Sequence, residues 1–385
     1  PLFMGRQDDV DFSYVELRPR TRLDEVAAGH PVEWYRQWVS AEDPSSAVWT
    51  TGDAPRLSAA NTQLPVMMVG GWSDAFIEAQ LQAWKELPRR AESLWVIGPW
   101  AHLGQAPADF PLEGLDGPGS GGGQMVQYPR ILDWLDSHLS GKAARYPSHG
   151  VASYVVGGGR WEEYADWPPP TTERRWGARA GTGRCDGSLA EEADFSTPLS
   201  YVYDPENPLP SRGGAGLLAG AIFFMNGVPP GFLKMDDPCP RRTDLLRFVG
   251  EPLEAPLHLA GVFRAELEVS SDAPDSAFGF RLLMERAGRA YMLREGFATL
   301  ALRNGGPRTP YTPGERVQLS VDTAPLEMEF QPGDKIVMYI TSSSFPAYEA
   351  HPNQAGILAE ATTTRPAQQS IYAATLILPE VAEAL

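Results

Sequence analysis

Residues 64–102 read LPVMMVGGWSDAFIEAQLQAWKELPRRAESLWVIGPWAH, with two short apolar runs on either side of an amphipathic segment. The runs, Pro65 to Val69 and Leu94 to Ile97, have the length and composition of buried parallel strands. Between them, Phe76 to Leu87 has apolar residues at i, i+4 and i+7, which predicts a helix with one apolar face. The stretch therefore predicts a β-α-β unit with a right-handed crossover, typical of a layered α/β domain.

One ionisable residue follows each predicted strand: Asp74 after the first and His102 after the second. Loops beyond the carboxyl ends of parallel strands are where such folds place their chemistry. An Asp followed by a His is the second half of a Ser…Asp…His triad in α/β-hydrolase order, in which the carboxylate orients the imidazole that acts as base. Two other interpretations remain open on spacing alone. Asp74 can simply cap the following helix, and His102 can be a polar surface residue.

The segments GWSDAF (residues 71–76) and GPWAH (residues 98–102) resemble those of a family of CocE/NonD-type serine hydrolases. The family contains the cocaine esterases, the α-amino-acid ester hydrolases and the X-Pro dipeptidyl-peptidases. In it, a GW-x-D-x-F motif carries the triad Asp and a GPW-x-H motif carries the triad His. The resemblance implies these two catalytic roles for Asp74 and His102.

Two later segments resemble the same family, YVYDPENPLPSRGG (201–214) and FQPGDKIVMYITSSSFPAYEAHPN (330–353). Four matching segments in the family's order make the resemblance specific. It implies the C-terminal portion of an α/β hydrolase, an α/β part followed by an all-β part. The expected domains are a helical cap segment over residues 1–60, the C-terminal part of an α/β-hydrolase domain over 61–146, and a jelly-roll β-sandwich over 147–385.

The chain departs from the family at the nucleophile, because the family's G-x-S-x-G elbow does not occur in the sequence. Ser73 adjoins Asp74 on the same turn, so the two side chains are not expected to converge on one imidazole. Ser120 lies in a GPGSGGG run that has nothing to hold its hydroxyl rigidly. We therefore expect the nucleophilic serine and the oxyanion-hole donors on a missing N-terminal segment or on a partner chain.

The resemblance implies a serine hydrolase that cleaves a small-molecule ester or amide through an acyl-enzyme, or that transfers the acyl group to another nucleophile. The alternative is a non-catalytic or repurposed relative that uses its β-sandwich for binding or assembly. Candidate substrate contacts are Phe76, which matches a substrate-contacting aromatic of the family, and Trp72, for which core packing is the favoured interpretation. Trp49 is a third candidate, because it lies in a polar loop expected over Asp43 to Thr51, which resembles the family's acidic stretch before the Asp strand.

Three further helices are expected around the β-α-β unit. Asp24 to Ala28 and Glu33 to Val39 fit helices, and the aromatic residues of the second belong either to the family's active-site cap or to the core. Tyr128 to Leu139 fits a helix that ends near Gly141 and closes the α/β layer. Its predicted apolar face consists of Ile131, Leu132, Leu135 and Leu139.

From residue 147 onward, short strands alternate with turns. The first expected strand of this part is Ala152 to Val156. Phe263 to Val269 alternates apolar and charged residues, which is typical of a half-buried antiparallel strand. Many such strands, separated by Pro and Gly, predict a β-sandwich of the jelly-roll type. Other strands are expected at 278–284, 291–293, 316–321, 335–340 and 371–378.

The charge and the apolar runs of the chain argue against some classes of function. With 32 basic and 49 acidic residues, the chain has a net charge of −17, which argues against binding to nucleic acid or to an anionic membrane. No apolar run approaches the roughly 20 residues of a membrane span. No targeting signal is visible, and a cytoplasmic location is the default expectation.

No cofactor or metal is expected. Cys185 and Cys239 lack the spacing of metal ligands, although a disulfide between them remains open. Apart from His102, the histidines have no chemically suggestive neighbours in the sequence and are expected to be structural or exposed. They are His30, His138, His149, His258 and His351.

Overall fold

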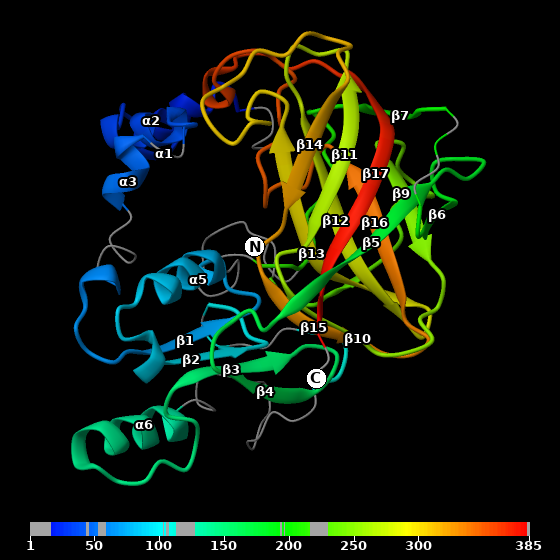
Figure 1. The fold of residues 1–385 in the computed structure, drawn as a ribbon. Helices are drawn as coiled ribbons and strands as arrows, with labels where there is room; N and C mark the ends of the chain where they lie inside the picture. The colour runs from blue at the N-terminus through cyan, green and yellow to red at the C-terminus, as the bar shows by residue number, and fades with distance from the viewer. Residues whose placement is uncertain are drawn as a thin grey trace.

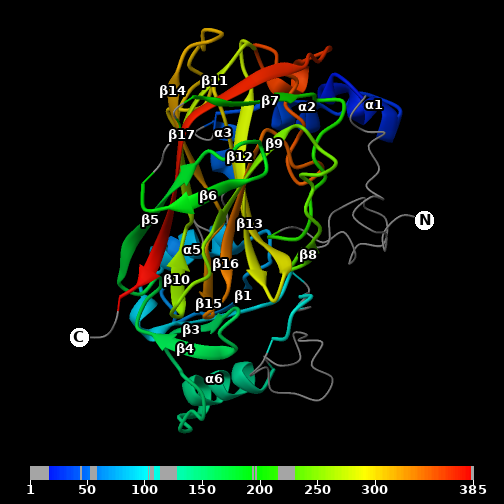
Figure 2. The ribbon, with the colours of Figure 1, turned by 90° about the vertical axis from the view of Figure 1, so that its right-hand side faces the viewer.

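The computed structural model of the chain describes residues 17–43, 46–52, 59–102, 104, 108–112, 128–192, 195, 197–215 and 230–382. A small, mostly parallel sheet lies at one end of a large β-sandwich (Figure 1). Short N-terminal helices lie at the other end of the sandwich, and a second view shows the same separation (Figure 2). The predicted succession of an α/β part and a β-sandwich is therefore observed.

The small sheet has the strand order β1-β2-β3-β4. β1 (Met67–Gly71) pairs in parallel with β2 (Leu94–Gly98). They are connected by α5 (Ile77–Glu86) and the single turn η4 (Arg90–Glu92), and α5 buries the predicted apolar face. The predicted β-α-β unit is thus confirmed. Among the described residues β1 pairs with β2 alone, so its other edge is open.

The sheet extends past the boundary expected at residue 146. β3 (Gly150–Val155) pairs in parallel with β2, and β4 (Arg160–Tyr164) pairs antiparallel with β3. The strand expected at Ala152 to Val156 therefore belongs to the α/β sheet, and its predicted place in the β-rich part was wrong. Every residue of β3 is buried, and a fully buried strand has the same apolar composition in either kind of sheet.

α6 (Tyr128–Ser140) forms where the sequence predicts a helix, but it packs by another face. Asp133 and Trp134 are its buried residues. Trp134 Nε1 donates to the Ser148 carbonyl at 3.0 Å, and the Asp133 carboxylate accepts the backbone N–H of Arg145 at 2.7 Å. These bonds to the following turn fix which side faces the sheet, so the predicted apolar face is largely exposed. Its exposed members are Leu132 (63%), Leu135 (39%) and Leu139 (80%).

The β-rich part contains thirteen described strands. Most follow one hydrogen-bonded order, β14-β11-β17-β5-β6-β9-β16-β12-β13-β8, while β10 pairs with β15 and β17, and β7 pairs with β17. The bounds are β5 (Thr171–Arg179), β6 (Gly187–Ala190), β7 (Leu199–Tyr203), β8 (Lys234–Met235), β9 (Leu245–Gly250), β10 (Leu257–Gly261), β11 (Arg264–Ser271), β12 (Ala277–Arg286), β13 (Arg289–Thr299), β14 (Val317–Asp322), β15 (Leu326–Phe330), β16 (Lys335–Thr341) and β17 (Ala367–Val381). The strands predicted after residue 262 are all present.

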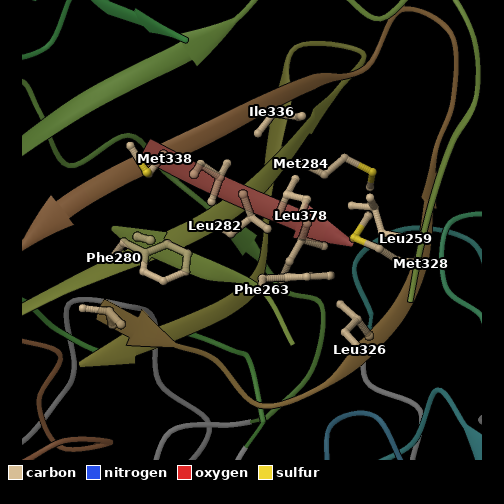
Figure 3. Packing of buried hydrophobic residues seen from close by; sticks show 14 of the residues in the cluster. Leu259, Phe263, Phe280, Leu282, Met284, Leu326, Met328, Ile336, Met338 and Leu378 are labelled. Atoms are coloured by element: carbon tan, nitrogen blue, oxygen red, sulfur yellow. The ribbon is translucent and has the colours of Figure 1, made fainter. Parts of the chain in front are cut away.

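The sandwich is held by a core of side chains that point inward from alternate strand positions. β11 buries Ala265, Leu267 and Val269 and exposes Glu266, as the alternation predicts. Side chains of several strands, such as Leu282, Met338 and Leu378, meet in the interior (Figure 3). A second, smaller buried cluster of the sandwich includes Leu283, Met292 and Val337. Close packing of this kind makes the sandwich a rigid support for the α/β sheet at its end.

The two later segments that resemble the hydrolase family lie side by side. The Ser211 N–H donates to the Phe345 carbonyl at 2.8 Å, and the Phe345 N–H donates to the Leu209 carbonyl at 2.9 Å. The Tyr203 hydroxyl donates to the His351 carbonyl at 3.0 Å. These bonds give the residues of both segments a structural role within the sandwich.

The N-terminal helices are short. They are α1 (Leu23–Ala28), α2 (Glu33–Ser40) and α3 (Ala47–Gly52), preceded by the turn η3 (Arg20–Arg22); a further turn, η6 (Leu358–Glu360), lies near them. Arg20 pairs with Glu349 at 2.7 Å, and Glu42 pairs with Arg308 of the sandwich. The two predicted helices are confirmed.

The aromatic residues of α2 do not belong to the core. Trp34 and Trp38 are 61% and 49% exposed, and their rings lie 5.7 Å apart. The core interpretation of these residues was therefore wrong. No hydrogen bond, ion pair or ring contact in the described part of the chain joins the three helices to Asp74 or His102.

The two cysteines form a disulfide. Cys185 and Cys239 have a Cα–Cα distance of 5.9 Å. A disulfide is more typical of an oxidising compartment than of the cytoplasm, so it does not support the expected cytoplasmic location. That location stays a prediction. None of the helices in the described residues has both the length and the apolar content needed to cross a membrane.

Candidate active site

Asp74 and His102 meet beyond the carboxyl ends of β1 and β2. His102 Nδ1 lies 3.2 Å from Asp74 Oδ2, the hydrogen bond expected if the carboxylate orients the imidazole as in a triad. The Asp74 side chain is 7% exposed and the His102 side chain 40% exposed. Since the carboxylate accepts, Nδ1 carries the proton, and Nε2 of the neutral ring is an acceptor. Nε2 has no hydrogen-bond partner among the described residues, so it is available to a further group.

Asp74 also acts at the start of α5. Its Oδ1 accepts the backbone N–H of Phe76 at 2.9 Å, while its own backbone N–H donates to the Gly71 carbonyl at 3.0 Å. The N-cap of α5 is Phe76, so Asp74 is not the capping residue that the alternative interpretation made it; its Oδ1 closes the turn just before the helix, while its Oδ2 bonds to His102. The local bond at the helix start fixes the carboxylate, and the second oxygen is left to orient His102.

Glycine at the end of β1 allows the loops that carry Asp74 and His102 to approach closely. The Trp72 N–H donates to the Gly98 carbonyl at 2.8 Å, and the Ser73 N–H donates to the Trp100 carbonyl at 3.1 Å. A Cβ on Gly71 would lie 2.0 Å from that Trp100 oxygen. Any larger residue would separate the turns that carry Asp74 and His102.

A cavity of about 200 Å³ opens beside the pair. Besides Asp74 and His102, it is lined by the end of β1 and by Tyr128 and Ile131 of α6. The Ser73 hydroxyl is buried and has no hydrogen-bond partner among the described residues, so it makes no hydrogen bond to the His102 ring. Ser120 lies outside the described residues. The described residues thus supply a base and its orienting carboxylate beside a cavity.

Phe76 is the candidate substrate contact that the structure brings to the pair. Its side chain is 46% exposed, and its ring lies edge-on to the His102 ring with 5.0 Å between centroids. An exposed aromatic ring next to a potential base is suited to form the wall of a substrate site.

Trp72 does not reach this site. Its side chain is fully buried, its Nε1 donates to the Tyr154 carbonyl at 2.8 Å, and its ring packs 5.1 Å from Trp167. The predicted substrate contact is therefore incorrect for Trp72, and the core interpretation is correct. A large apolar ring beside a strand end can pack in the interface between sheet and sandwich or line a pocket, and the sequence pattern is the same in both cases.

Trp49 lies on α3, where its ring is 42% exposed and 6.0 Å from the Trp38 ring. Its Nε1 donates to the Ala41 carbonyl at 2.6 Å. In the described part of the chain it makes no contact with Asp74 or His102, so the structure does not place it in the same site.

Two histidines without chemically suggestive neighbours in the sequence have carboxylate partners in the structure. His258 Nε2 lies 2.9 Å from Glu327, and His351 Nε2 lies 3.4 Å from Asp275. Glu327 and Asp275 are buried within the sandwich, far along the chain from their partners, so no spacing could reveal them. The described residues contain no group of His, Cys, Asp and Glu that could hold a metal ion.

Comparison with known families identifies the chain. The profile of the X-Pro dipeptidyl-peptidase C-terminal non-catalytic domain matches residues 143–375, which is more than half of the chain. The profile of the X-Pro dipeptidyl-peptidase (S15 family) matches residues 4–104, which include both Asp74 and His102. The chain belongs to the X-Pro dipeptidyl-peptidase family.

Named relatives within this family are esterases and peptidases. The cocaine esterase of Rhodococcus sp. (strain MB1 Bresler) is 29% identical over 314 residues, which are 77% of this chain and 51% of that protein. The chain spans about half the length of the curated relatives it matches.

Two solved structures share the fold. An aminopeptidase from a marine sediment Thaumarchaeota archaeon is 22% identical, with a TM-score of 0.77 over 97% of this chain and 64% of that chain. An α-amino acid ester hydrolase is 20% identical, with a TM-score of 0.78 over 98% of this chain and 65% of that chain.

Proposed function

We propose that this chain supplies the Asp and the His of the Ser-His-Asp triad of a serine hydrolase that acts on small esters or amides. The observation that carries the proposal is the hydrogen bond between Asp74 Oδ2 and His102 Nδ1, which leaves His102 Nε2 unpartnered beside a cavity. Membership of the X-Pro dipeptidyl-peptidase family supports it, because the family's named members are hydrolases.

In the proposed reaction, His102 Nε2 takes the proton of a serine hydroxyl as the serine oxygen attacks the acyl carbon of the substrate. Asp74 holds the imidazole in the required tautomer and stabilises the imidazolium. His102 then gives the proton to the departing alcohol or amine, which leaves an acyl-enzyme. In the second half, water attacks the acyl carbon as His102 Nε2 takes its proton. The bond from the acyl carbon to the serine oxygen then breaks, His102 returns the proton to that oxygen, and the carboxylic acid leaves. Another nucleophile in place of water gives acyl transfer.

The serine is proposed to lie on polypeptide outside the described residues, either on an N-terminal segment or on a partner chain. Two features of the α/β layer are consistent with such a neighbour. In the described chain the outer edge of β1 lacks a partner strand, so its backbone N–H and C=O groups are open to pairing with a further strand. α6, whose Tyr128 and Ile131 line the cavity, exposes Leu132, Leu135 and Leu139.

The proposed substrate is a small molecule whose acyl part lies against Phe76. The ring is the exposed aromatic surface in contact with the proposed base. The names of the relatives, cocaine esterase and α-amino acid ester hydrolase, indicate that this family accepts small esters.

We also propose that the strands of the β-sandwich are connected as in a jelly roll, as the sequence predicts.

A fluorophosphonate probe, which reacts with activated serines, tests the proposal on the full-length protein together with any chain that co-purifies. We expect one labelled serine, identified by peptide mass mapping, on a G-x-S-x-G segment. His102→Ala should abolish labelling, while His149→Ala, a change at an exposed histidine remote in sequence, should not. Labelling that survives His102→Ala would contradict the triad. A folded protein that neither labels nor turns over esters would favour the non-catalytic alternative.

A further inference from the structure

Arg294, in β13 of the sandwich, reaches out of its own domain to the turn that carries Asp74. Its Nη2 donates to the carbonyl of Trp72, two residues before Asp74. The rest of the guanidinium is fixed by other carbonyls of the sandwich: Nη1 donates to Leu293 at 2.9 Å, and Nη2 donates also to Pro325 at 2.9 Å. A planar guanidinium with this many fixed bonds holds its remaining partner in one place.

The burial of Arg294 is unusual for a cation. Its side chain is 1% exposed, and in the described part of the chain no carboxylate lies within ion-pair distance of it. Burial lowers the pKa of Arg294 from 12.5 to about 9, although the charge of Glu78 acts in the opposite direction. An unpaired buried charge is costly unless its hydrogen bonds are satisfied, and here backbone carbonyls satisfy them.

The turn from Gly71 to Asp74 has a defined set of backbone bonds. The N–H groups of Trp72, Ser73 and Asp74 are all bonded within the α/β layer, to Gly98, Trp100 and Gly71. The Trp72 carbonyl, in contrast, accepts a hydrogen bond from the sandwich, donated by Arg294. The Arg294 bond therefore links the position of the turn to the β-sandwich.

We propose that Arg294 is a positioning residue for Asp74, so that the domain described in the family as non-catalytic sets the geometry of the acid of the triad. This inference rests on the proposed function of Asp74. Without the bond from Arg294, the Trp72 carbonyl lacks its partner and the turn is free to shift. The Asp74 carboxylate, bonded to His102 at 3.2 Å, then loses its alignment.

Arg281 offers a matched control for a purely structural effect. It is also fully buried in the sandwich, on the neighbouring strand β12. Its bonds go to Glu295 at 2.9 Å and to the Pro210 carbonyl at 2.7 Å, both within the sandwich. Arg281→Met should destabilise the sandwich without moving Asp74, whereas Arg294→Met should do both. Arg294→Lys keeps the charge, loses the planar fork, and serves as a milder variant if Arg294→Met does not fold.

Hydrogen exchange, read by mass spectrometry on peptides covering residues 66–76, is the first readout, and it does not depend on activity. We expect faster exchange at the amides of Ser73 and Asp74 in Arg294→Met or Arg294→Lys, relative to both wild type and Arg281→Met. Exchange equal to that of Arg281→Met would overturn the proposal, whether or not the protein is an enzyme.

Steady-state kinetics on the full-length protein is the second readout. Arg294→Met should lower kcat by about ten- to a hundredfold with little change in KM, the size expected of a small misplacement of a catalytic group. In an Asp74→Asn background the same change should cause no further loss of kcat, because the two residues act through one geometry. Equal losses of kcat in both backgrounds would show that Arg294 acts independently of Asp74. If wild type has no activity, the proposed function fails, and the exchange experiment alone decides the role of Arg294.

Discussion

The hydroxyl of Tyr164, in β4 of the parallel-sheet layer, donates a 2.6 Å hydrogen bond to the buried carboxylate of Glu327, in β15 of the sandwich. Burial, followed by the charge of Glu327, raises the pKa of Tyr164, so the hydroxyl keeps its proton and remains a donor. Trp167 Nε1 donates to the same carboxylate at 2.9 Å, His258 Nε2 lies at 2.9 Å, and the Ser153 hydroxyl donates as well. A fully bonded carboxylate thus joins the two layers.

Glu327→Gln should destabilise the protein. The amide nitrogen replaces one acceptor oxygen, so donors that bond to that oxygen lose their partner in a buried site. We expect the free energy of unfolding to fall by about 1–3 kcal/mol, measured by urea denaturation. Glu266→Gln, which changes an exposed glutamate paired with Arg175 at 3.2 Å, is the control and should cost less than about 1 kcal/mol. Equal effects would show that the Glu327 bonds do not stabilise the interface.

Changes at the proposed triad should affect turnover and leave folding intact. In the full-length protein, His102→Ala should remove nearly all esterase activity, because His102 is the base that Asp74 orients. Asp74→Asn should lower kcat on the order of 10⁴-fold, since the imidazole is then held in the wrong tautomer. The measurement is steady-state kinetics with circular dichroism as the folding check. Near-normal kcat in a folded Asp74→Asn variant would exclude the triad role, and Asp74 would then only stabilise the turn before α5.

Phe76→Ala should act on substrate binding instead. Its ring lies against His102 but takes no part in proton transfer, so we expect a raised KM or an altered substrate preference with kcat largely kept. Phe76→Tyr retains the ring and should stay close to wild type. Kinetics on a series of esters with increasing acyl size tests this. A loss of kcat with unchanged KM across the series would argue against a pocket wall.

The N-terminal helices should loosen in acid. The hydrogen bond from Arg36 lowers the pKa of Asp24 from 3.8 to about 2, helped by the backbone N–H of Val32 at 2.6 Å. A carboxyl with a depressed pKa in the folded state stabilises that state above pH 3.8, and this contribution is lost as the pH falls towards 2. Hydrogen exchange of residues 23–40 in wild type relative to Asp24→Asn should therefore differ at pH 5 and converge near pH 2. A constant difference across this pH range would contradict the assignment.

The spacing of apolar residues along the sequence determined many of the secondary-structure elements. The apolar runs and helical spacing of residues 64–102 predict β1, α5 and β2, and alternation predicts β11, because these elements depend on neighbours within one or two turns of chain. The hydrogen bond between Asp74 and His102 was also predictable, since parallel strands deliver their following residues to the same edge of the sheet.

Tertiary structure decided what depends on partners distant in sequence. β3 belongs to the parallel sheet because it pairs with the free edge of β2. Trp134 of α6 faces inward because its Nε1 bonds to the turn that follows the helix. Trp72 is buried because Trp167 packs against it. The bond from Arg294 to the Trp72 carbonyl spans 222 residues of sequence and has no local signature. Side-chain type fixes what a residue can bond to, and only the folded chain determines which partner comes within reach.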